Sequence, residues 1–185
     1  MLTSEEIALL SSYHIQITGP SGSGKTYMAE RLAELGYSAI DADVIEDLGR
    51  FLDADGNVHE YDHDGGQEWL ERHFWSWDKS VLHAYMRDTE RAIICGGAGN
   101  DREASHLFTQ VFYLVLPKDE ILVNLLRPER FNPFGRTPEQ QAFASHMIDS
   151  FYADIPEDWI PLHSRDAQSL VSEMESHLGD SLAMQ

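Results

Sequence analysis

The stretch GPSGSGKT, residues 19–26, constrains this chain more than any other part of its sequence. It stands between an apolar, β-type run, HIQIT at residues 14–18, and an amphipathic run at residues 25–36 in which apolar residues recur at helical spacing. Three glycines are followed by Lys25 and Thr26. The stretch therefore predicts a glycine-rich turn that joins a buried strand to the N-terminus of a helix.

A turn of this composition is suited to hold phosphate groups. Glycines let the backbone curl so that successive N–H groups point inward at phosphate oxygens, and the helix that follows adds its positive end. The spacing G-x-x-x-x-G-K-[ST] places Lys25 to reach the β- and γ-phosphates and Thr26 to ligate Mg²⁺. A turn that only caps a helix would not need these two residues. We therefore expect ATP and Mg²⁺ to bind here, at Gly19, Ser21, Gly22, Ser23, Gly24, Lys25 and Thr26.

The rest of the chain alternates strand-like and helix-like segments. Strands are predicted at residues 14–18, 37–40, 91–95, 111–117 and 159–164. Helices are predicted at residues 25–35, 67–88, 118–126, 138–153 and 166–178, with short ones at 4–10 and 44–52 and a loop at 53–66. This order predicts an α/β three-layer sandwich, a five-stranded parallel sheet flanked by helices. A length of 185 residues fits a single domain.

Composition excludes several partners. The formal charge of −19, from 32 acidic against 13 basic residues, repels nucleic acid and anionic membranes. No apolar run reaches the roughly 18 residues of a membrane helix, and the first residues carry acids where a signal peptide has bases. We expect a cytoplasmic monomer or homodimer in which the single cysteine, Cys95, is a core residue.

Two acids, Asp41 and Asp43, follow the predicted strand at 37–40. Acids at the carboxyl end of such a strand face the crevice where open α/β sheets bind ligands, and one of them could orient or deprotonate an acceptor hydroxyl. Alternatively, Asp43 is a helix N-cap and Asp41 a solvated turn residue. After the strand at 91–95 come Gly96 and Gly97, whose bare backbone either admits a ligand or forms a flexible turn.

Three of the 13 basic residues, Arg127, Arg130 and Arg136, gather in RPERFNPFGR, a Pro- and Gly-punctuated stretch that cannot be one continuous helix. This composition is typical of an arginine-bearing lid that offsets charge on a transferring phosphoryl group, with Arg127 and Arg136 as the preferred members. Alternatively, the three arginines pair with surface carboxylates.

These motifs together resemble the small P-loop kinases, a group that includes shikimate, adenylate, gluconate and dephospho-coenzyme A kinases. The resemblance covers most of the chain loosely, and only the phosphate loop is highly specific. It implies the P-loop NTPase fold over residues 1–185, with an acceptor-binding segment at about 44–90 and a lid at about 127–140. It also implies that Asp41 supports Mg²⁺, that Asp43 contacts the acceptor, and that the backbone of Gly96 and Gly97 binds it, although Ala98 replaces a third glycine.

Other signals point away from specific sites. The loop DADGNVHEYDHDG has its glycine too early for a calcium loop, so His59, Asp62, His63 and Asp64 are read as a solvated loop, with His59 or Asp62 still able to touch an acceptor. The stripe Trp69, His73, Phe74, Trp77 could stack a nucleobase but fits the core better, with Trp75 the exposed member. Neither Arg50 nor Arg72 aligns with the acceptor-binding arginine of shikimate kinases, so a carboxylate acceptor is not expected.

The sequence as a whole predicts an ATP- and Mg²⁺-dependent phosphotransferase that acts on the hydroxyl or phosphate of a small molecule. The predicted catalytic residues are Lys25, Asp41, Asp43, Arg127 and Arg136. The alternative is a nucleotide-binding regulator or weak NTPase that has no small-molecule acceptor.

Overall fold

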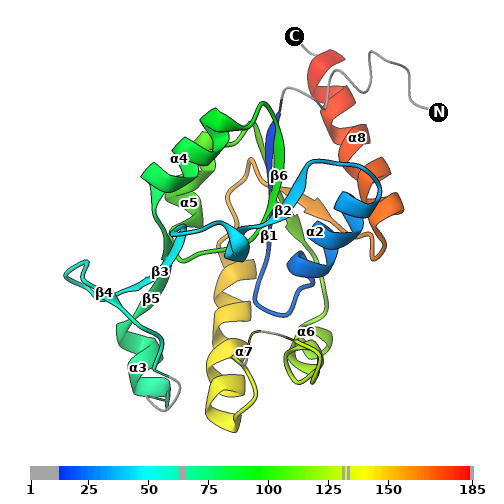
Figure 1. Cartoon of the computed structure of the whole chain (residues 1–185). Coiled ribbons are helices and arrows are strands. Elements are labelled where there is room, and N and C mark those ends of the chain that lie inside the picture. Colours follow the sequence, from blue (N-terminus) through cyan, green and yellow to red (C-terminus); the bar gives the residue numbers. More distant parts are fainter. Residues whose placement is uncertain (1–12, 63–65, 131, 133, 184–185) are drawn as a thin grey trace.

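The computed structural model describes residues 13–62, 66–130, 132 and 134–183. Its centre is a five-stranded parallel sheet with the order β2-β6-β1-β7-β8, in which β1, first in the sequence, is the middle strand (Figure 1). The strands are β1 His14–Thr18, β2 Ala39–Asp41, β6 Ala92–Cys95, β7 Gln110–Leu114 and β8 Ile160–Leu162. The predicted parallel sheet is confirmed, and each of its strands was expected at nearly these residues.

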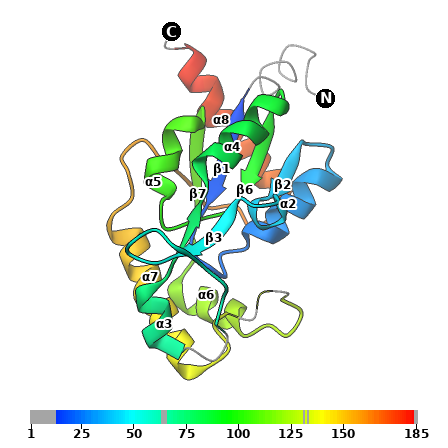
Figure 2. The same cartoon turned by 60° about the vertical axis from the view of Figure 1, so that its left-hand side comes forward.

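Helices cover the sheet on both faces, as Figures 1 and 2 show. On one face, α2 (Lys25–Glu34) and α8 (Ala167–Ala183) bury Leu32 and Met174 among the side chains of β1 and β7. On the other face, α4 (Lys79–Asp88) and α5 (Asp101–Ala104) pack on β6. Each fully buried leucine or isoleucine contributes roughly 1.5–3 kcal/mol. These two apolar layers hold the predicted three-layer sandwich together.

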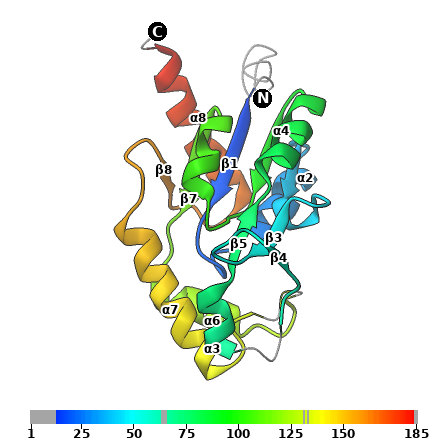
Figure 3. The same ribbon diagram turned by 90° about the vertical axis from the view of Figure 1, so that its left-hand side faces the viewer.

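Two more helices, α6 (Lys118–Leu125) and α7 (Pro138–Ala153), pack on each other beyond the carboxyl end of β1 (Figures 1 and 3). Helix α7 begins and ends where the sequence predicts. Its start is fixed by a capping box in which Thr137 and Gln140 each accept a hydrogen bond from the other's backbone amide. Two short 3₁₀ turns, η1 (Ala42–Val44) and η2 (Ser105–Leu107), complete the α/β layers.

The predicted long helix at residues 67–88 is wrong. The chain forms α3 (Gly66–Arg72), then strand β5 (Phe74–Trp77), and only then α4. The helix is interrupted because β5 pairs antiparallel with β3 (Gly49–Leu52), and because Asp78 accepts the amides of Ser80 and Val81 as the N-cap of α4. The apolar spacing resembled one helix because three consecutive elements, α3, β5 and α4, each bury apolar residues.

The short helix predicted at residues 44–52 is also wrong, because only the 3₁₀ turn η1 forms there, at its first residue. Asp47 adopts a left-handed conformation (φ 61°), which ends the turn, and β3 begins at Gly49. A Cβ at Gly49 would lie 2.1 Å from Cζ2 of Trp75, so only glycine fits there. The predicted loop at 53–66 contains the two-residue strand β4 (Val58–His59), which completes a small antiparallel sheet with the order β4-β3-β5.

Aromatic rings form the core of this small sheet. The ring of Phe51 lies 5.3 Å from that of Tyr61, 4.9 Å from that of Trp69 and 5.0 Å from that of Trp75, between ring centroids. Of the predicted aromatic stripe, Trp77 is buried in the core, Trp69 and His73 are half-buried, and Phe74 is exposed, so core packing is confirmed for Trp77 and only in part for the others. The exposed member is thus Phe74 and not Trp75, which lies half-buried between Phe51 and Gly49.

Parts of the sequence prediction fall outside the described residues, namely the helix at 4–10, His63 and Asp64. Within the described residues, no helix combines the length and the apolar character needed to cross a membrane. Cys95 is fully buried in β6, as expected.

Candidate active site

The glycine turn leaves the carboxyl end of β1 and enters α2. Gly22 and Gly24 have positive φ angles, 88° and 98°, which glycine adopts without strain. A Cβ at Gly22 would lie 2.8 Å from the carbonyl oxygen of Ile121, and Asn124 Nδ2 donates to the Gly22 carbonyl over 3.1 Å. The turn is therefore held between α2 and α6, in the shape that the phosphate-binding pattern requires.

Lys25 lies half-buried over this turn. Its Nζ donates to the carbonyls of Gly19 (2.7 Å) and Pro20 (3.0 Å). Burial lowers the pKa of Lys25, and the charges of Asp43, Asp101 and Asp41 oppose this effect. The ammonium thus lies close enough to these three carboxylates to interact electrostatically with each of them. The predicted lysine and the two predicted acids are brought together at one point.

Asp41 and Asp43 lie at the carboxyl end of β2. Asp41 Oδ1 accepts the amide of Asp43 over 2.9 Å, so Asp41 caps the 3₁₀ turn η1, and Asp43 is not itself the cap. Asp43 is exposed. Partial removal from water and the neighbouring Asp41 carboxylate raise the pKa of Asp43, while Lys25 lowers it. A carboxylate with a raised pKa is better matched to accept a proton from a hydroxyl.

Asp101, the first residue of α5, is a site residue that sequence reasoning missed. Its side chain is buried, and its two oxygens accept hydrogen bonds from Thr18 Oγ1 (2.6 Å), Ala98 N (2.8 Å) and Gln16 Nε2 (3.2 Å). These bonds tie the glycine loop after β6 to the end of β1. Burial raises the pKa of Asp101 to about 6. The only signal in the sequence was one acid directly after GGAGN.

Asp101 makes the stability of the fold depend on pH. Its pKa is higher in the folded chain than in the unfolded one, so the folded state holds the proton more tightly and loses stability as pH rises from about 4 to about 7. A pKa difference of this size corresponds to about 3 kcal/mol. Asp101→Asn keeps the shape of the side chain but cannot titrate. It should therefore remove this pH-dependent contribution to the stability of the fold.

The measurement is urea unfolding at pH 4.5, 6 and 7.5 for the wild type, for Asp101→Asn and for Asp158→Asn, an exposed carboxylate. We expect the stability of Asp101→Asn relative to wild type to increase steadily with pH, and Asp158→Asn to follow the wild type. Parallel curves for all three proteins would show that Asp101 does not titrate in this range.

The two predicted acceptor glycines have different surroundings. A Cβ at Gly96 would lie 2.2 Å from Cβ of Ala42 and 2.9 Å from Cζ2 of Trp77, so packing alone requires glycine there. A Cβ at Gly97 would lie 3.1 Å from Thr18 Oγ1 and 3.3 Å from the Gly19 carbonyl. Gly97 therefore lies against the start of the glycine turn, next to the residues that surround Lys25.

The arginines of the 127–140 segment are placed unequally. Arg130 is half-buried, and its guanidinium donates to the carbonyls of Leu125 (3.0 Å) and Phe134 (2.9 Å) and to Ser21 Oγ (3.4 Å). Arg136 is exposed and donates to the Arg130 carbonyl over 2.8 Å, and Arg127 is exposed just after α6. The structure thus brings Arg130 to the glycine turn, whereas the sequence favoured Arg127 and Arg136.

Gln140 joins this segment to the 44–90 segment. Its Oε1 accepts the amides of Gly135 (3.0 Å) and Arg136 (3.1 Å), and its Nε2 donates to the hydroxyl of Tyr61 over 3.3 Å. The side chain is buried. No pattern in the sequence indicates this bridge, because its ends lie 79 residues apart.

The residues around Lys25 fit a Mg²⁺-nucleotide. The hydroxyl of Ser23 is buried in the turn without a partner among the described residues, Thr26 is exposed at the start of α2, and Asp41 supplies carboxylate oxygen. Mg²⁺ prefers such oxygen ligands and commonly shares one or two of them with substrate phosphates. Across the described residues, no three His, Cys, Asp or Glu side chains converge into a metal site.

The fold is that of small P-loop kinases. Shikimate kinase from Acinetobacter baumannii in complex with shikimate is 18% identical, with a TM-score of 0.57 over 95% of this chain and 98% of that one. A gluconokinase from Sinorhizobium meliloti 1021 is 16% identical, with a TM-score of 0.52 over 95% and 98%. Shikimate kinase from Bacteroides thetaiotaomicron is 16% identical, with a TM-score of 0.54 over 90% and 98%.

No protein-family model matches the sequence, and a comparison with curated proteins finds no match. At this level of identity the likeness establishes the fold, and the resemblance expected from the motifs is confirmed at that level.

Proposed function

We propose that this protein is an ATP- and Mg²⁺-dependent phosphotransferase that acts on a small molecule. The observation that carries the proposal is the position of Lys25. Its ammonium spans the phosphate-binding turn and interacts electrostatically with Asp41, Asp43 and Asp101 at the carboxyl ends of the sheet. The neighbouring folds, a shikimate kinase and a gluconokinase, support the same reaction class.

Each residue of the site has a role that its position supports. The amides from Gly19 to Thr26 and the Lys25 ammonium would bind the phosphates, and Thr26 and Asp41 would hold Mg²⁺. Asp43 would orient the acceptor hydroxyl and take its proton. ATP supplies the phosphoryl group and Mg²⁺ offsets its charge. We assign the whole chain to one kinase-like domain in the cytoplasm, where ATP is available, with acceptor contacts in the 44–90 segment and at Gly96 and Gly97.

Arg130 rather than Arg127 is expected to act on the phosphoryl group. Arg130→Ala should lower kcat by about 100-fold, because a guanidinium beside Ser21 can offset charge on the transferring group. Arg127→Ala, a matched substitution at an exposed site three residues away, should change kcat by less than about threefold.

Because Arg130 also bonds to backbone carbonyls, the melting temperature of each variant is measured, and Arg130→Lys tests whether the charge alone restores activity. A larger loss in Arg127→Ala than in Arg130→Ala would show that the segment rearranges for transfer and that Arg127 carries the role.

The proposal is tested by ADP formation from Mg²⁺-ATP with the purified protein, screened against nucleosides, nucleoside monophosphates, sugars, shikimate and dephospho-coenzyme A. Stimulation by an acceptor, absent from a Lys25→Ala blank, establishes a kinase. If ATP binds tightly but every acceptor leaves a low rate unchanged, the protein is a nucleotide-binding regulator and the proposal is wrong.

A further inference from the structure

The acceptor-binding segment, residues 44–90, is strongly acidic, with twelve acidic residues against four basic ones. Each of the four basic side chains lies in an ion pair. Arg72 pairs with Glu68 (2.6 Å), Lys79 with Glu103 (3.1 Å) and Arg87 with Asp88 (3.0 Å). The fourth, Arg50, lies between Asp47 and Asp78. Among its described residues, the segment therefore has no lysine or arginine whose charge is not already paired with a carboxylate.

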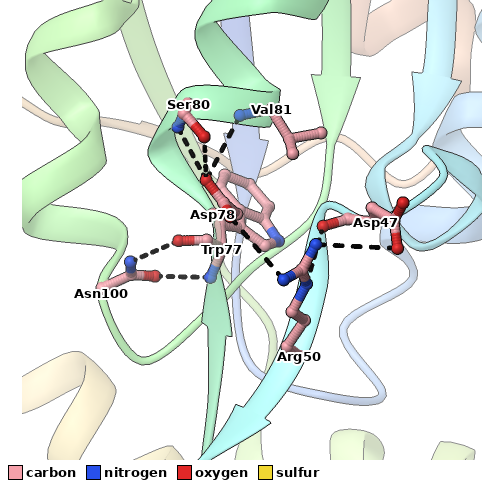
Figure 4. A network of polar contacts seen from close by, with 7 residues as sticks. All are labelled: Asp47, Arg50, Trp77, Asp78, Ser80, Val81 and Asn100. Atoms are coloured by element: carbon pink, nitrogen blue, oxygen red, sulfur yellow. Dashed lines mark hydrogen bonds and ion pairs between the residues drawn. The ribbon is translucent and has the colours of Figure 1, made fainter. Parts of the chain in front are cut away.

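Arg50 lies on β3, next to β5, the strand that contacts the glycine loop after β6 (Figure 4). Its Nη2 is 3.7 Å from Asp47 Oδ1, its Nη1 is 3.9 Å from Asp78 Oδ2, and its Nε donates to the Asp47 carbonyl over 3.3 Å. Hydrogen bonds from Ser80 lower the pKa of Asp78, which keeps this carboxylate ionised. Two carboxylates around one guanidinium leave the group with a net negative charge.

This group borders the acceptor side of the site because β5 is clamped to the glycine loop. The Asn100 side chain accepts the amide of Trp77 and donates to its carbonyl, both over 2.9 Å, and Gly99 N donates to the Trp75 carbonyl over 2.7 Å (Figure 4). The Trp77 ring lies directly under Gly96 and beside Ala42, which separates Asp41 from Asp43. The wall formed by Asp41, Ala42, Asp43 and Trp77 therefore carries two carboxylates, and Asp78 of the Arg50 group follows Trp77 directly in the chain.

The remaining basic residues do not reach this wall. All 13 lie within the described residues. Lys25 and Arg130 contact the glycine turn, and Arg136 donates to the Arg130 carbonyl. Helix α7, which packs on α3, contains no lysine or arginine. Among the described residues, no lysine or arginine forms an ion pair with Asp41 or Asp43; Arg31 pairs with Glu34, Arg102 with Asp154, Lys118 with Asp149 and Arg165 with Glu120. The basic side chains that contact the glycine turn, Lys25 and Arg130, lie on the phosphate side of the site.

We infer that the acceptor is a hydroxyl compound without a carboxylate or phosphate group, either an uncharged polyol or an amine-bearing one. This inference rests on the proposed function. A carboxylate would face Asp41 and Asp43 with no guanidinium to bind it, whereas hydroxyl and ammonium groups donate hydrogen bonds to these side chains. Recognition would differ from that of the structurally similar shikimate kinase and gluconokinase, whose named substrates are anions.

Every bond and proton in the proposed phosphoryl transfer can be accounted for with these residues. The acceptor oxygen forms a bond to the γ-phosphorus of ATP while the bond from that phosphorus to the β–γ bridging oxygen breaks. The acceptor proton passes to the Asp43 carboxylate, and ADP leaves with the bridging oxygen.

The first test compares hydroxyl compounds that differ in charge but share a carbon chain. Gluconate, glucitol and glucamine provide an anionic, a neutral and a cationic member, and each heads a wider panel of its class: sugar acids and sugar phosphates, sugars and polyols, amino sugars and amino alcohols. ADP formation and the mass of the phosphorylated product are measured with saturating Mg²⁺-ATP. We expect at least about tenfold stimulation in the neutral or cationic class and none in the anionic class.

Stimulation by the anionic class alone would overturn the inference and leave the kinase assignment standing. If no class stimulates although ATP binds, the proposed function itself fails. The two failures are therefore distinguishable.

The second test changes the Arg50 group. Asp47→Asn with Asp78→Asn frees the Arg50 charge, and asparagine tolerates both the left-handed conformation at 47 and the N-cap at 78. Acceptor binding, measured by calorimetry, should shift toward the anionic member of a matched pair by about tenfold. Asp88→Asn, which frees Arg87 at the far end of α4, is the control and should not shift it. The inference would be overturned if the double variant kept the wild-type preference between the two acceptors. It would also be overturned if the wild-type protein bound an anionic acceptor and Arg50→Gln abolished that binding.

Discussion

Replacing Lys25 by alanine is expected to lower ATP turnover by at least about 100-fold while the protein stays folded, because one charged donor at a developing phosphoryl charge is worth that much. In the structure the Lys25 ammonium bonds only to the carbonyls of Gly19 and Pro20, and burial lowers its pKa. Its removal therefore breaks no hydrogen bond between distant elements that the described residues show, although it leaves Asp41, Asp43 and Asp101 without the neighbouring positive charge. The measurements are kcat for acceptor-dependent ADP formation, ATP affinity and melting temperature.

Lys118→Ala is the matched control. Lys118, the first residue of α6, pairs with Asp149 of α7 and forms no hydrogen bond with the glycine turn among the described residues, so its loss should leave kcat unchanged. If Lys25→Ala turns over ATP at the rate of Lys118→Ala, then the glycine turn does not perform transfer and the central assignment is wrong. If Lys25→Ala melts well below both other proteins, the lysine is needed for folding, and a Lys25→Met variant separates charge from packing.

Asp43→Asn is expected to reduce transfer to the acceptor by about 100- to 10,000-fold, the usual contribution of a general base. The backbone amide that bonds to Asp41 is kept, so the 3₁₀ turn should survive. Affinity for ATP should stay within about threefold of wild type, because Asp43 is assigned to the acceptor and not to the phosphates. Single-turnover rates with saturating acceptor, together with ATP titrations, separate these two quantities.

The pH profile adds an independent readout for Asp43. A general base must be ionised, so the rate falls as pH decreases through its pKa, which removal from water and Asp41 raise above the ordinary value. Asp43→Asn should lose this acid limb, and Asp55→Asn, an exposed carboxylate on the β3–β4 turn, should retain it. Equal losses of ATP binding and transfer in Asp43→Asn would contradict an acceptor role.

Local patterns in the sequence predicted the layers of the fold and the phosphate side of the site. Strand β1, the glycine turn and α2 are encoded within about twenty consecutive residues, and Gly22 and Gly24 can adopt their positive φ angles because they are glycines. The limits of α7 were predictable for the same reason, since Thr137, Pro138 and Gln140 define its start locally.

The acceptor side could not be predicted in this way. Residues 67–88 have apolar spacing that fits a helix, but Phe74–Trp77 became a strand because β3 was available to pair with it. Pairing with a neighbouring strand overrides local helix propensity when the pairing buries large aromatic rings. The bend at Asp47 and the fit of Trp75 over Gly49 likewise exist only once both strands are in place.

The sequence by itself determined that the chain carries a glycine turn of the phosphate-binding pattern on a parallel α/β sheet, because those signals are short-range and periodic. Tertiary structure alone decided which charges meet. It placed Asp101 on Thr18 across 83 residues and Arg130 on Ser21 across 109, and it enclosed Arg50 between two carboxylates. Charge pairing depends on distances of a few ångströms between segments remote in sequence, and folding brings such segments together without leaving a local pattern.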